Sequence, residues 1–272
     1  MNDNNKGVSI NNFGPGLLDS ISWIKFDGDS KKPTLVFLHD SLGCIALWRD
    51  FPNKLGQELN CNVIVYDRMG YGKSGPFISH IRGLDYMEIE ADILNDLMAS
   101  WEIENAVLFG HSDGGSIALL MAAKYPDKIR GVISEGAHVF VEDITIKGIE
   151  QAVELYKTTD LKARLTKYHG DKTEAMFMAW TQTWLREDFK DWNIESYLKN
   201  IVCPVLVIQG EEDEYGTLKQ VQSIVENTVG KSQELIIPKI GHNPHKEVPQ
   251  YILEKSIAFL SSQFTALNRI SK

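Results

Sequence analysis

The stretch Leu-Phe-Gly-His-Ser-Asp-Gly-Gly, residues 108–115, predicts the end of a buried strand that turns sharply into a helix, with Ser112 at the turn. Gly110 and Gly114 flank the serine in a G-x-S-x-G pattern. Small residues at these positions let strand and helix approach closely enough to hold the central side chain in an exposed, strained turn. Ser112 is therefore a candidate nucleophile.

The flanking residues favour this interpretation. Residues 105–109 form a short apolar run typical of a strand covered on both faces. Residues 116–123 are rich in helix formers and end shortly before Pro126. Strand, turn and helix thus follow in the order that a nucleophile turn requires. An exposed glycine loop with an incidental serine would not need this order.

Length and composition predict one large α/β domain or two small ones, since the chain has 272 residues, 43% of them hydrophobic. The formal net charge of −9 disfavours a nucleic acid or an anionic membrane as partner. The start of the chain is polar, and no apolar run reaches the about 18 residues of a membrane helix. We therefore expect a soluble, cytoplasmic protein.

Three widely spaced cysteines, Cys44, Cys61 and Cys203, form no C-x-x-C motif. Their odd number and spacing fit reduced thiols in the cytoplasm better than a disulfide framework or a zinc site. Each is expected to pack as a small core residue.

Strand and helix patterns alternate along most of the chain, which indicates parallel strands joined by right-handed crossovers. Residues 21–26 alternate apolar and polar side chains and predict an antiparallel edge strand after a polar leader. A helix is expected from Asp85, with a capping-box-like start and an apolar face of Ile89, Ile93 and Leu97. Further strands are expected at 34–38, 61–66, 131–134, 204–209 and 234–237.

Residues 70–75, Gly-Tyr-Gly-Lys-Ser-Gly, match the G-x-G-x-x-G pattern of dinucleotide sites directly after a predicted strand. That pattern must open a helix, whereas Pro76 follows here and no helical periodicity begins before Asp85. A phosphate loop is also disfavoured, because Asp67 occupies the position of its first glycine.

The alternation stops between residues 140 and 200, where only amphipathic helical patterns occur. We expect a core at 1–139, a helical cap at 140–200 and the rest of the core at 201–272. Aromatic residues of the cap are candidate pocket walls, although such stripes are more often plain core. They are Phe177, Trp180, Trp184 and Trp192.

A serine hydroxyl needs a histidine to take its proton and a carboxylate to fix the histidine tautomer. His242 fits best, because it follows the last predicted strand and parallel sheets place their sites at the carboxyl ends of strands. Asp213, after the strand at 204–209, is the preferred acid. The order serine, aspartate, histidine is the one expected for this turn.

Alternatives stay open for the acid. Glu212 neighbours Asp213, and Glu135, at the end of the preceding strand, could approach the same histidine from the other side. His245 is close to His242 in the sequence, but a third metal ligand is missing from the pattern, so no metal site is expected.

Taken together, these motifs resemble the α/β-hydrolase superfamily along the whole chain, and the superfamily implies a mostly parallel twisted sheet with helices on both faces and a helical cap. The stretches that carry the resemblance are residues 39–43, 67–74, 110–115, 210–213 and 241–242. Within the superfamily, residues 112–115, Ala118, 122–126 and 136–137 are similar to the biphenyl hydrolase-like, or valacyclovirase-like, serine esterases.

The resemblance implies an oxyanion hole formed by the backbone N–H of Asp113 and of a residue in the loop at 39–43, with Ser41 as the preferred second donor. The usual glycine after the histidine of that loop is Asp40 here, so the second donor stays open. In the valacyclovirase-like group, the position of Asp113 is linked to recognition of a substrate α-amino group. The alternative is that Asp113 caps the following helix.

We therefore expect a serine hydrolase of the carboxylesterase type that cleaves small carboxylic esters through an acyl-enzyme intermediate, without a cofactor and with a small-molecule ester as its partner. A C–C bond hydrolase or a small-peptide aminopeptidase would use the same triad. From another class, a ligand sensor with slow or absent turnover is the alternative. The oligomeric state cannot be predicted from these patterns.

Overall fold

The computed structural model describes residues 6–12, 18–77, 79 and 81–270. Its centre is a sheet with the strand order β1-β2-β4-β3-β5-β6-β7-β8. Neighbouring strands from β4 to β8 pair in parallel, while β2 pairs antiparallel with both β1 and β4. The strands are β1 (Lys6–Asn12), β2 (Leu18–Phe26), β3 (Thr34–Leu38), β4 (Val63–Tyr66), β5 (Ala106–His111), β6 (Ile129–Glu135), β7 (Val205–Gly210) and β8 (Ser232–Ile237).

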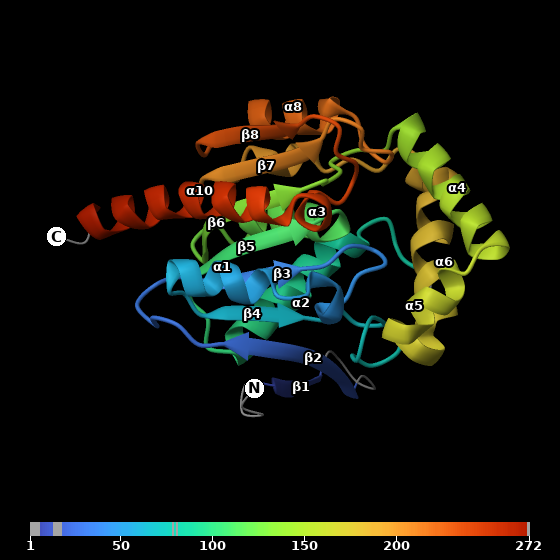
Figure 1. The fold of residues 1–272 in the computed structure, drawn as a ribbon, viewed down its shortest axis with the longest axis horizontal. Helices are drawn as coiled ribbons and strands as arrows, with labels where there is room; N and C mark the ends of the chain where they lie inside the picture. The colour runs from blue at the N-terminus through green and yellow to red at the C-terminus, as the bar shows by residue number, and fades with distance from the viewer. Residues whose placement is uncertain (1–5, 13–17, 78, 80, 271–272) are drawn as a thin grey trace.

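Helices cover both faces of this sheet (Figure 1). One face carries α1 (Phe51–Leu59) and α10 (Pro249–Ile270), and the other carries α2 (Tyr86–Ser100), α3 (Asp113–Lys124) and α8 (Leu218–Asn227). Because successive side chains of a strand point to opposite faces, Val36 and Leu38 join one core cluster, while Leu35 and Phe37 join the other. Burial on both faces explains why the central strands are continuous apolar runs.

The interval between β6 and β7 is occupied by helices: α4 (Asp143–Thr158), α5 (Leu161–His169), α6 (Thr173–Trp184) and α7 (Glu195–Leu198). In Figure 1, α4, α5 and α6 stand beside the edge of the sheet toward which the arrows of the parallel strands point. These helices therefore lie at the carboxyl ends of the strands, where the candidate residues are. The exact division into core and cap at residues 140 and 200 stays a prediction.

One local expectation was wrong and another was confirmed only in part. Residues 21–26 do not form the sheet edge, because β1, within the supposed polar leader, pairs with β2 on its outer side. In α2, Leu97 is buried and Ile93 packs against the core as predicted, but Ile89 is exposed. Asp85 precedes α2 without a side-chain capping hydrogen bond.

The backbone N–H groups of the glycine-rich loop after β4 bind to side chains of the protein itself. The N–H of Lys73 donates to the Asp67 carboxylate at 2.8 Å, and the N–H of Gly72 donates to Nδ1 of His169 at 2.9 Å. The next helix, α2, begins only at Tyr86. The loop thus lacks the helix start that a dinucleotide site needs.

Among the described helices, none combines the length and the apolar character needed to cross a membrane.

Candidate active site

Ser112 lies at a tight turn between β5 and α3. Its φ of 54° and ψ of −122° are unusual for a residue with a side chain, and such strain is typical of functional turns. A Cβ on Gly110 would lie 2.1 Å from the carbonyl oxygen of Gly114, and a Cβ on Gly114 would lie 2.1 Å from that of Leu38. Only glycine fits at these two positions, which explains the G-x-S-x-G pattern in steric terms.

His242 and Asp213 form a buried pair. Nδ1 of His242 donates to the Asp213 carboxylate, at 2.8 Å from Oδ2 and 2.9 Å from Oδ1. Asp213 follows β7 and His242 follows β8, so neighbouring parallel strands deliver the two side chains to the same edge of the sheet. The structure therefore brings together the histidine and the acid that the sequence singled out.

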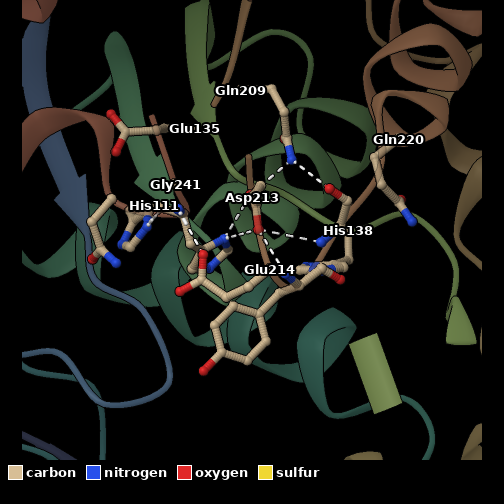
Figure 2. Close-up of polar contacts among 12 residues, drawn as sticks. His111, Glu135, His138, Gln209, Asp213, Glu214, Gln220 and Gly241 are labelled. Carbon is tan, nitrogen blue, oxygen red and sulfur yellow. Dashed lines mark hydrogen bonds and ion pairs between the residues drawn. The ribbon is translucent and has the colours of Figure 1, made fainter. Parts of the chain in front are cut away.

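Further donors surround the Asp213 carboxylate. The N–H groups of Tyr215 and Gly216 donate to Oδ1 at 2.8 and 3.2 Å, and Nε2 of Gln209 donates to Oδ2 at 2.7 Å. Figure 2 shows the Gln209 amide pointing to this carboxylate from the strand behind it. Sequence reasoning missed Gln209, although its place at the end of β7, four residues before the acid, was a usable signal.

These contacts set the charge of the pair. Burial alone would raise the pKa of Asp213, but the nearby His242 and the backbone donors lower it below its ordinary value. For His242, burial alone would lower the pKa, yet the negative charge of Asp213 and its hydrogen bond raise it above 6.5. Asp213 is thus held as a carboxylate that stabilises a protonated His242.

Ser112 and His242 line one cavity of about 130 Å³ at the carboxyl edge of the sheet. Its other walls come from the loops after β3, β6, β7 and β8, from the start of α3 and from helices α4 and α6. They are Asp40, Ser41, Leu42, Asp113, His138, Thr145, Ile149, Trp180, Trp184, Glu214, Tyr215 and Asn243. Larger hollows of about 730 and 810 Å³ lie elsewhere on the surface, but neither Ser112 nor His242 lines them.

Of the cap aromatics, Trp180 and Trp184 line this cavity. Phe177 and Trp192 are buried in the surrounding core and do not belong to its walls. Half of the candidate pocket walls are thus core residues, as aromatic stripes at helical spacing often are.

The loop after β3 contains His39 and Asp40, which directly precede Ser41, the expected second oxyanion donor. Nε2 of His39 accepts from the N–H of Arg68 at 3.0 Å, so Nδ1 carries the hydrogen and donates to the carbonyl of Asp40 at 2.7 Å. The Arg68 guanidinium donates to the same carbonyl at 3.1 Å. The backbone of this loop is therefore fixed although Asp40 replaces the usual glycine, and Ser41 lines the cavity beside it.

The Asp113 side chain has partners within the protein. Its carboxylate accepts from the Tyr86 hydroxyl at 3.1 Å and lies 3.8 Å from Arg68 and 4.0 Å from Arg82. Asp113 is the first residue of α3, whose N-cap is Ser112. Its N–H is therefore one of the amides at the helix start that have no acceptor inside the helix. Tyr86 and Arg82 were missed by sequence reasoning, because nothing in the pattern links them to the turn.

The alternative acids contact other groups. Glu212 is exposed. Glu135 is buried and accepts from Nδ1 of His245 at 2.6 Å, so its partner is His245 and not His242. Together with His111, these two residues are the group whose donor atoms, within 4.8 Å of one another, come nearest to a metal site among the described residues. Because the 2.6 Å contact is a hydrogen bond that uses Nδ1 of His245, the group fits a proton-sharing pair better than a metal site.

The helices between β6 and β7 are joined to the rest of the fold by His169, which sequence reasoning also missed. Its Nδ1 accepts from the N–H of Gly72 at 2.9 Å, so Nε2 carries the hydrogen and donates to the carbonyl of Leu42 at 3.1 Å. One imidazole of α5 thereby joins the glycine-rich loop to the loop beside the cavity.

Comparisons with known proteins agree with this fold. A family model described as alpha/beta hydrolase fold matches residues 33–186. The human serine hydrolase BPHL is 30% identical over 190 residues, which cover 67% of this chain and 64% of that protein. The chain thus spans slightly less than two thirds of the length of that relative.

Solved structures share the fold at lower identity. MGS-M2, an alpha/beta hydrolase enzyme from a deep-sea metagenome library, superposes with a TM-score of 0.74 at 20% identity and covers 94% of this chain and 97% of its own. A structure from a study of carboxylesterases of Nitrososphaera gargenis gives a TM-score of 0.71 at 20% identity, covering 93% and 98%. With the family match, the turn at Ser112 and the sheet order, this chain belongs to the α/β-hydrolase family.

Proposed function

We propose that this protein is a serine hydrolase of the carboxylesterase type, which cleaves small carboxylic esters through an acyl-enzyme intermediate. The observation that carries the proposal is the buried pair of His242 and Asp213 at the cavity that Ser112 also lines. Neighbouring hydrolases, including a serine hydrolase and carboxylesterases, support the reaction class.

In this proposal Ser112 attacks the ester carbonyl and His242 takes its proton. Since Nδ1 of His242 donates to Asp213, the other ring nitrogen, Nε2, is free to act as the base. The imidazolium formed in this step is stabilised by the adjacent carboxylate and then protonates the leaving alcohol. Water, activated by the same histidine, releases the acyl group in the second half of the reaction.

The negative charge that develops on the carbonyl oxygen needs donors that are in place beforehand. We assign this role to the N–H groups of Asp113 and Ser41, since both residues line the cavity. The N-terminus of α3 adds a favourable dipole at the same point. One such donor contributes about 2.7–4 kcal/mol in comparable enzymes.

The size of the cavity supports a small acyl group. At about 130 Å³ it is well below the about 300–1,000 Å³ typical of sites for drug-sized ligands. Trp180 and Trp184 of the cap close it on one side. We therefore propose that residues 140–200 act as a cap that limits the acyl chain.

We also propose that the protein works in a reducing compartment such as the cytoplasm. Cys44, Cys61 and Cys203 are free and buried. Burial raises the pKa of each thiol, so that these cysteines are unreactive core residues.

The test is a panel of p-nitrophenyl esters of increasing acyl length, amino-acid esters and ring-cleavage diketones, measured with the wild type and Ser112→Ala. Loss of the nucleophile should lower turnover of the short esters by about 10⁴- to 10⁶-fold. Ser134→Ala is the matched control, because Ser134 is also buried, lies on the adjacent strand β6 and does not line the cavity.

Turnover of the short esters that needs Ser112 and survives in Ser134→Ala supports the esterase. Turnover of the diketones alone would replace it by a C–C bond hydrolase, and cleavage of amides alone by an aminopeptidase. If no substrate of the panel is turned over in a Ser112-dependent manner, the enzyme proposal fails in favour of a ligand sensor.

A further inference from the structure

A second acid–histidine pair lies behind the first. Oε1 of Glu135 accepts from Nδ1 of His245 at 2.6 Å and from the backbone N–H of His245 at 3.2 Å. Both side chains are almost fully buried, at 0% and 3% exposure. Neither residue lines the cavity, so this pair is separate from the groups that would touch a substrate.

His111 connects the two pairs. Its ring centroid lies 4.8 Å from that of His245 and 5.0 Å from that of His242. Nε2 of His111 is 2.8 Å from the carbonyl oxygen of His242, and only a ring N–H can make this contact. Burial lowers the pKa of His111 to about 3, so the ring is neutral and keeps this single hydrogen at working pH.

The same two strand ends also hold the nucleophile. His111 and Glu135 are register partners in β5 and β6, and Figure 2 shows both on the same side of Asp213. The backbone carbonyl of Glu135 accepts from the N–H of Ser112 at 2.8 Å. Glu135 therefore contacts the nucleophile through its backbone and the histidine loop through its side chain.

The other contacts of the loop at 241–245 include exposed ones, since the N–H groups of Gly241 and Asn243 each donate to the exposed Glu247 carboxylate at 3.2 Å. The loop follows β8, and His242 packs over Gly136, where a Cβ would come within 3.0 Å of Cε1 of the ring. The backbone N–H of His242 donates to the carboxylate of Glu214 at 3.2 Å, and Glu214 is exposed. Apart from the bond of His242 to Asp213, the contacts through His111 and Glu135 are thus the buried ones of this loop.

We propose that Glu135, acting through His245, and His111 are positioning residues that hold the loop of His242 in register with Ser112 and Asp213. A buried acid–histidine pair is a poor source of stability, because apolar residues of similar volume often serve as well. Its value lies in directional bonds, since reacting groups must be held within a fraction of an ångström. The expected effects on turnover and on Ser112 labelling rest on the proposed function, whereas the expected effect on the position of His242 does not.

The charged and titratable groups around this pair are few. Besides His111, Asp40 from the loop after β3 faces His245, with Lys246 beside it. The groups that face His242 itself are Asp213, Glu214, Asp40, His111, His138 and Tyr215, whose ring centroid lies 4.8 Å from that of His242. Glu135→Gln also removes a buried negative charge, which acts on His242 through space without contact. The shift that reports the position of the loop is therefore the one in His245→Asn, which keeps the Glu135 carboxylate.

The experiment compares Glu135→Gln and His245→Asn with Leu94→Ala. Leu94 is fully buried in α2, away from the cavity, and its truncation controls for a loss of stability alone. The measurements are kcat and KM on the best short ester, the rate of Ser112 labelling by a fluorophosphonate, and the pKa of His242 by NMR, assigned with His242→Asn.

Both variants should lose about 10- to 100-fold in kcat and in labelling rate, as small misplacements of reacting groups do, with KM nearly unchanged. The pKa of His242 should fall toward its ordinary value, because its bond to Asp213 weakens. His111→Gln, which keeps a donor at the position of Nε2, should retain more turnover than His111→Leu. The comparison of the two His111 variants also tests the proposal if Glu135→Gln does not fold.

Turnover, labelling and a His242 pKa equal to those of Leu94→Ala would overturn the proposal. So would equal turnover in the two His111 variants. If the wild type cleaves no ester and Ser112 is not labelled, the proposed function fails by itself. The NMR titration then still decides whether Glu135 positions His242.

Discussion

The hydroxyl of Tyr86 donates to the carboxylate of Asp113 at 3.1 Å, so the acidic residue next to the candidate nucleophile is bound from inside the protein. Arg68 and Arg82 lie 3.8 and 4.0 Å from the same carboxylate, and both are buried. These two guanidinium groups already compensate the negative charge of Asp113, which would otherwise attract a substrate ammonium group. This arrangement favours a structural role for the Asp113 side chain, while its N–H is the oxyanion donor that we propose.

The first prediction concerns Asp113→Asn. The ratio of kcat/KM for an amino-acid ester and its des-amino analogue should change little, because the carboxylate is already paired. Stability should fall by up to about 3–5 kcal/mol, since buried Arg82 loses its acidic partner and buried Arg68 keeps only Glu90 among the described residues, at 3.9 Å. Chemical denaturation and the two esters measure these effects.

Tyr86→Phe is the matched control, because it leaves all charges in place while it removes the hydrogen bond to Asp113 and the one that the hydroxyl accepts from Trp184. It should cost about 1–3 kcal/mol, since the buried Trp184 N–H loses its acceptor. A selective loss of the amino-acid ester in Asp113→Asn would show instead that the carboxylate reaches the substrate.

The features that sequence reasoning predicted are those set by local chemistry. The turn at Ser112 follows from steric limits at Gly110 and Gly114, and these limits leave a direct mark on the sequence. The central strands are apolar on both faces and so are equally visible. The order of strand ends then placed Asp213 and His242 at one edge of the sheet.

The features that were missed depend on partners far away in the sequence. The strand β1 is defined by its backbone pairing with β2, which its polar residues do not reveal. The predicted face of α2 was wrong at one position, because Ile89 is apolar but exposed, whereas Leu97 is buried as predicted and Met87 packs inside as well. Glu135 was considered for His242, and only the three-dimensional path of the loop gives it His245 as its partner.

The second prediction concerns pH. Only neutral His242 can take the proton of Ser112, and its pKa is raised by Asp213. We therefore expect kcat/KM to rise with pH through an apparent pKa above 6.5 and to be lost as the pH falls below it. Asp213→Asn should lower turnover by about 10⁴-fold, because the tautomer of His242 is no longer fixed.

The control for this profile is Glu214→Gln. Glu214 also raises the pKa of His242, but it is exposed and does not bind the ring nitrogen. The variant should show a small downward shift of the limb with kcat largely kept. A pH-independent wild-type rate between pH 5 and 9 would contradict the assignment of His242 as the base.

The third prediction tests the cap. Trp180 lines the cavity, so Trp180→Ala should open it toward longer acyl chains. Each additional buried CH₂ group contributes about 0.8 kcal/mol, which is about fourfold in kcat/KM. The optimum of a p-nitrophenyl ester series should therefore move to longer esters by several carbons.

Trp192→Leu provides the comparison for the cap variant. Trp192 is equally buried in the cap but does not belong to the cavity wall. It should alter stability without moving the optimum of the series. An identical shift in both variants would mean that the cap limits the acyl chain by its overall packing and not by Trp180.

The last prediction uses two glycines with nearly the same backbone. Gly136 has φ of 59° and Gly170 has φ of 58°, so alanine should cost about 1–2 kcal/mol at either position. A Cβ on Gly136 would lie 3.0 Å from Cε1 of His242, whereas none of the described atoms comes within 4 Å of a Cβ on Gly170. Gly136→Ala should therefore lower kcat at least tenfold more than Gly170→Ala at a similar loss of Tm, because only the former displaces the base. Equal turnover in the two folded variants would mean that catalysis tolerates a displacement of His242. That outcome would contradict the view that the base must be held tightly in place.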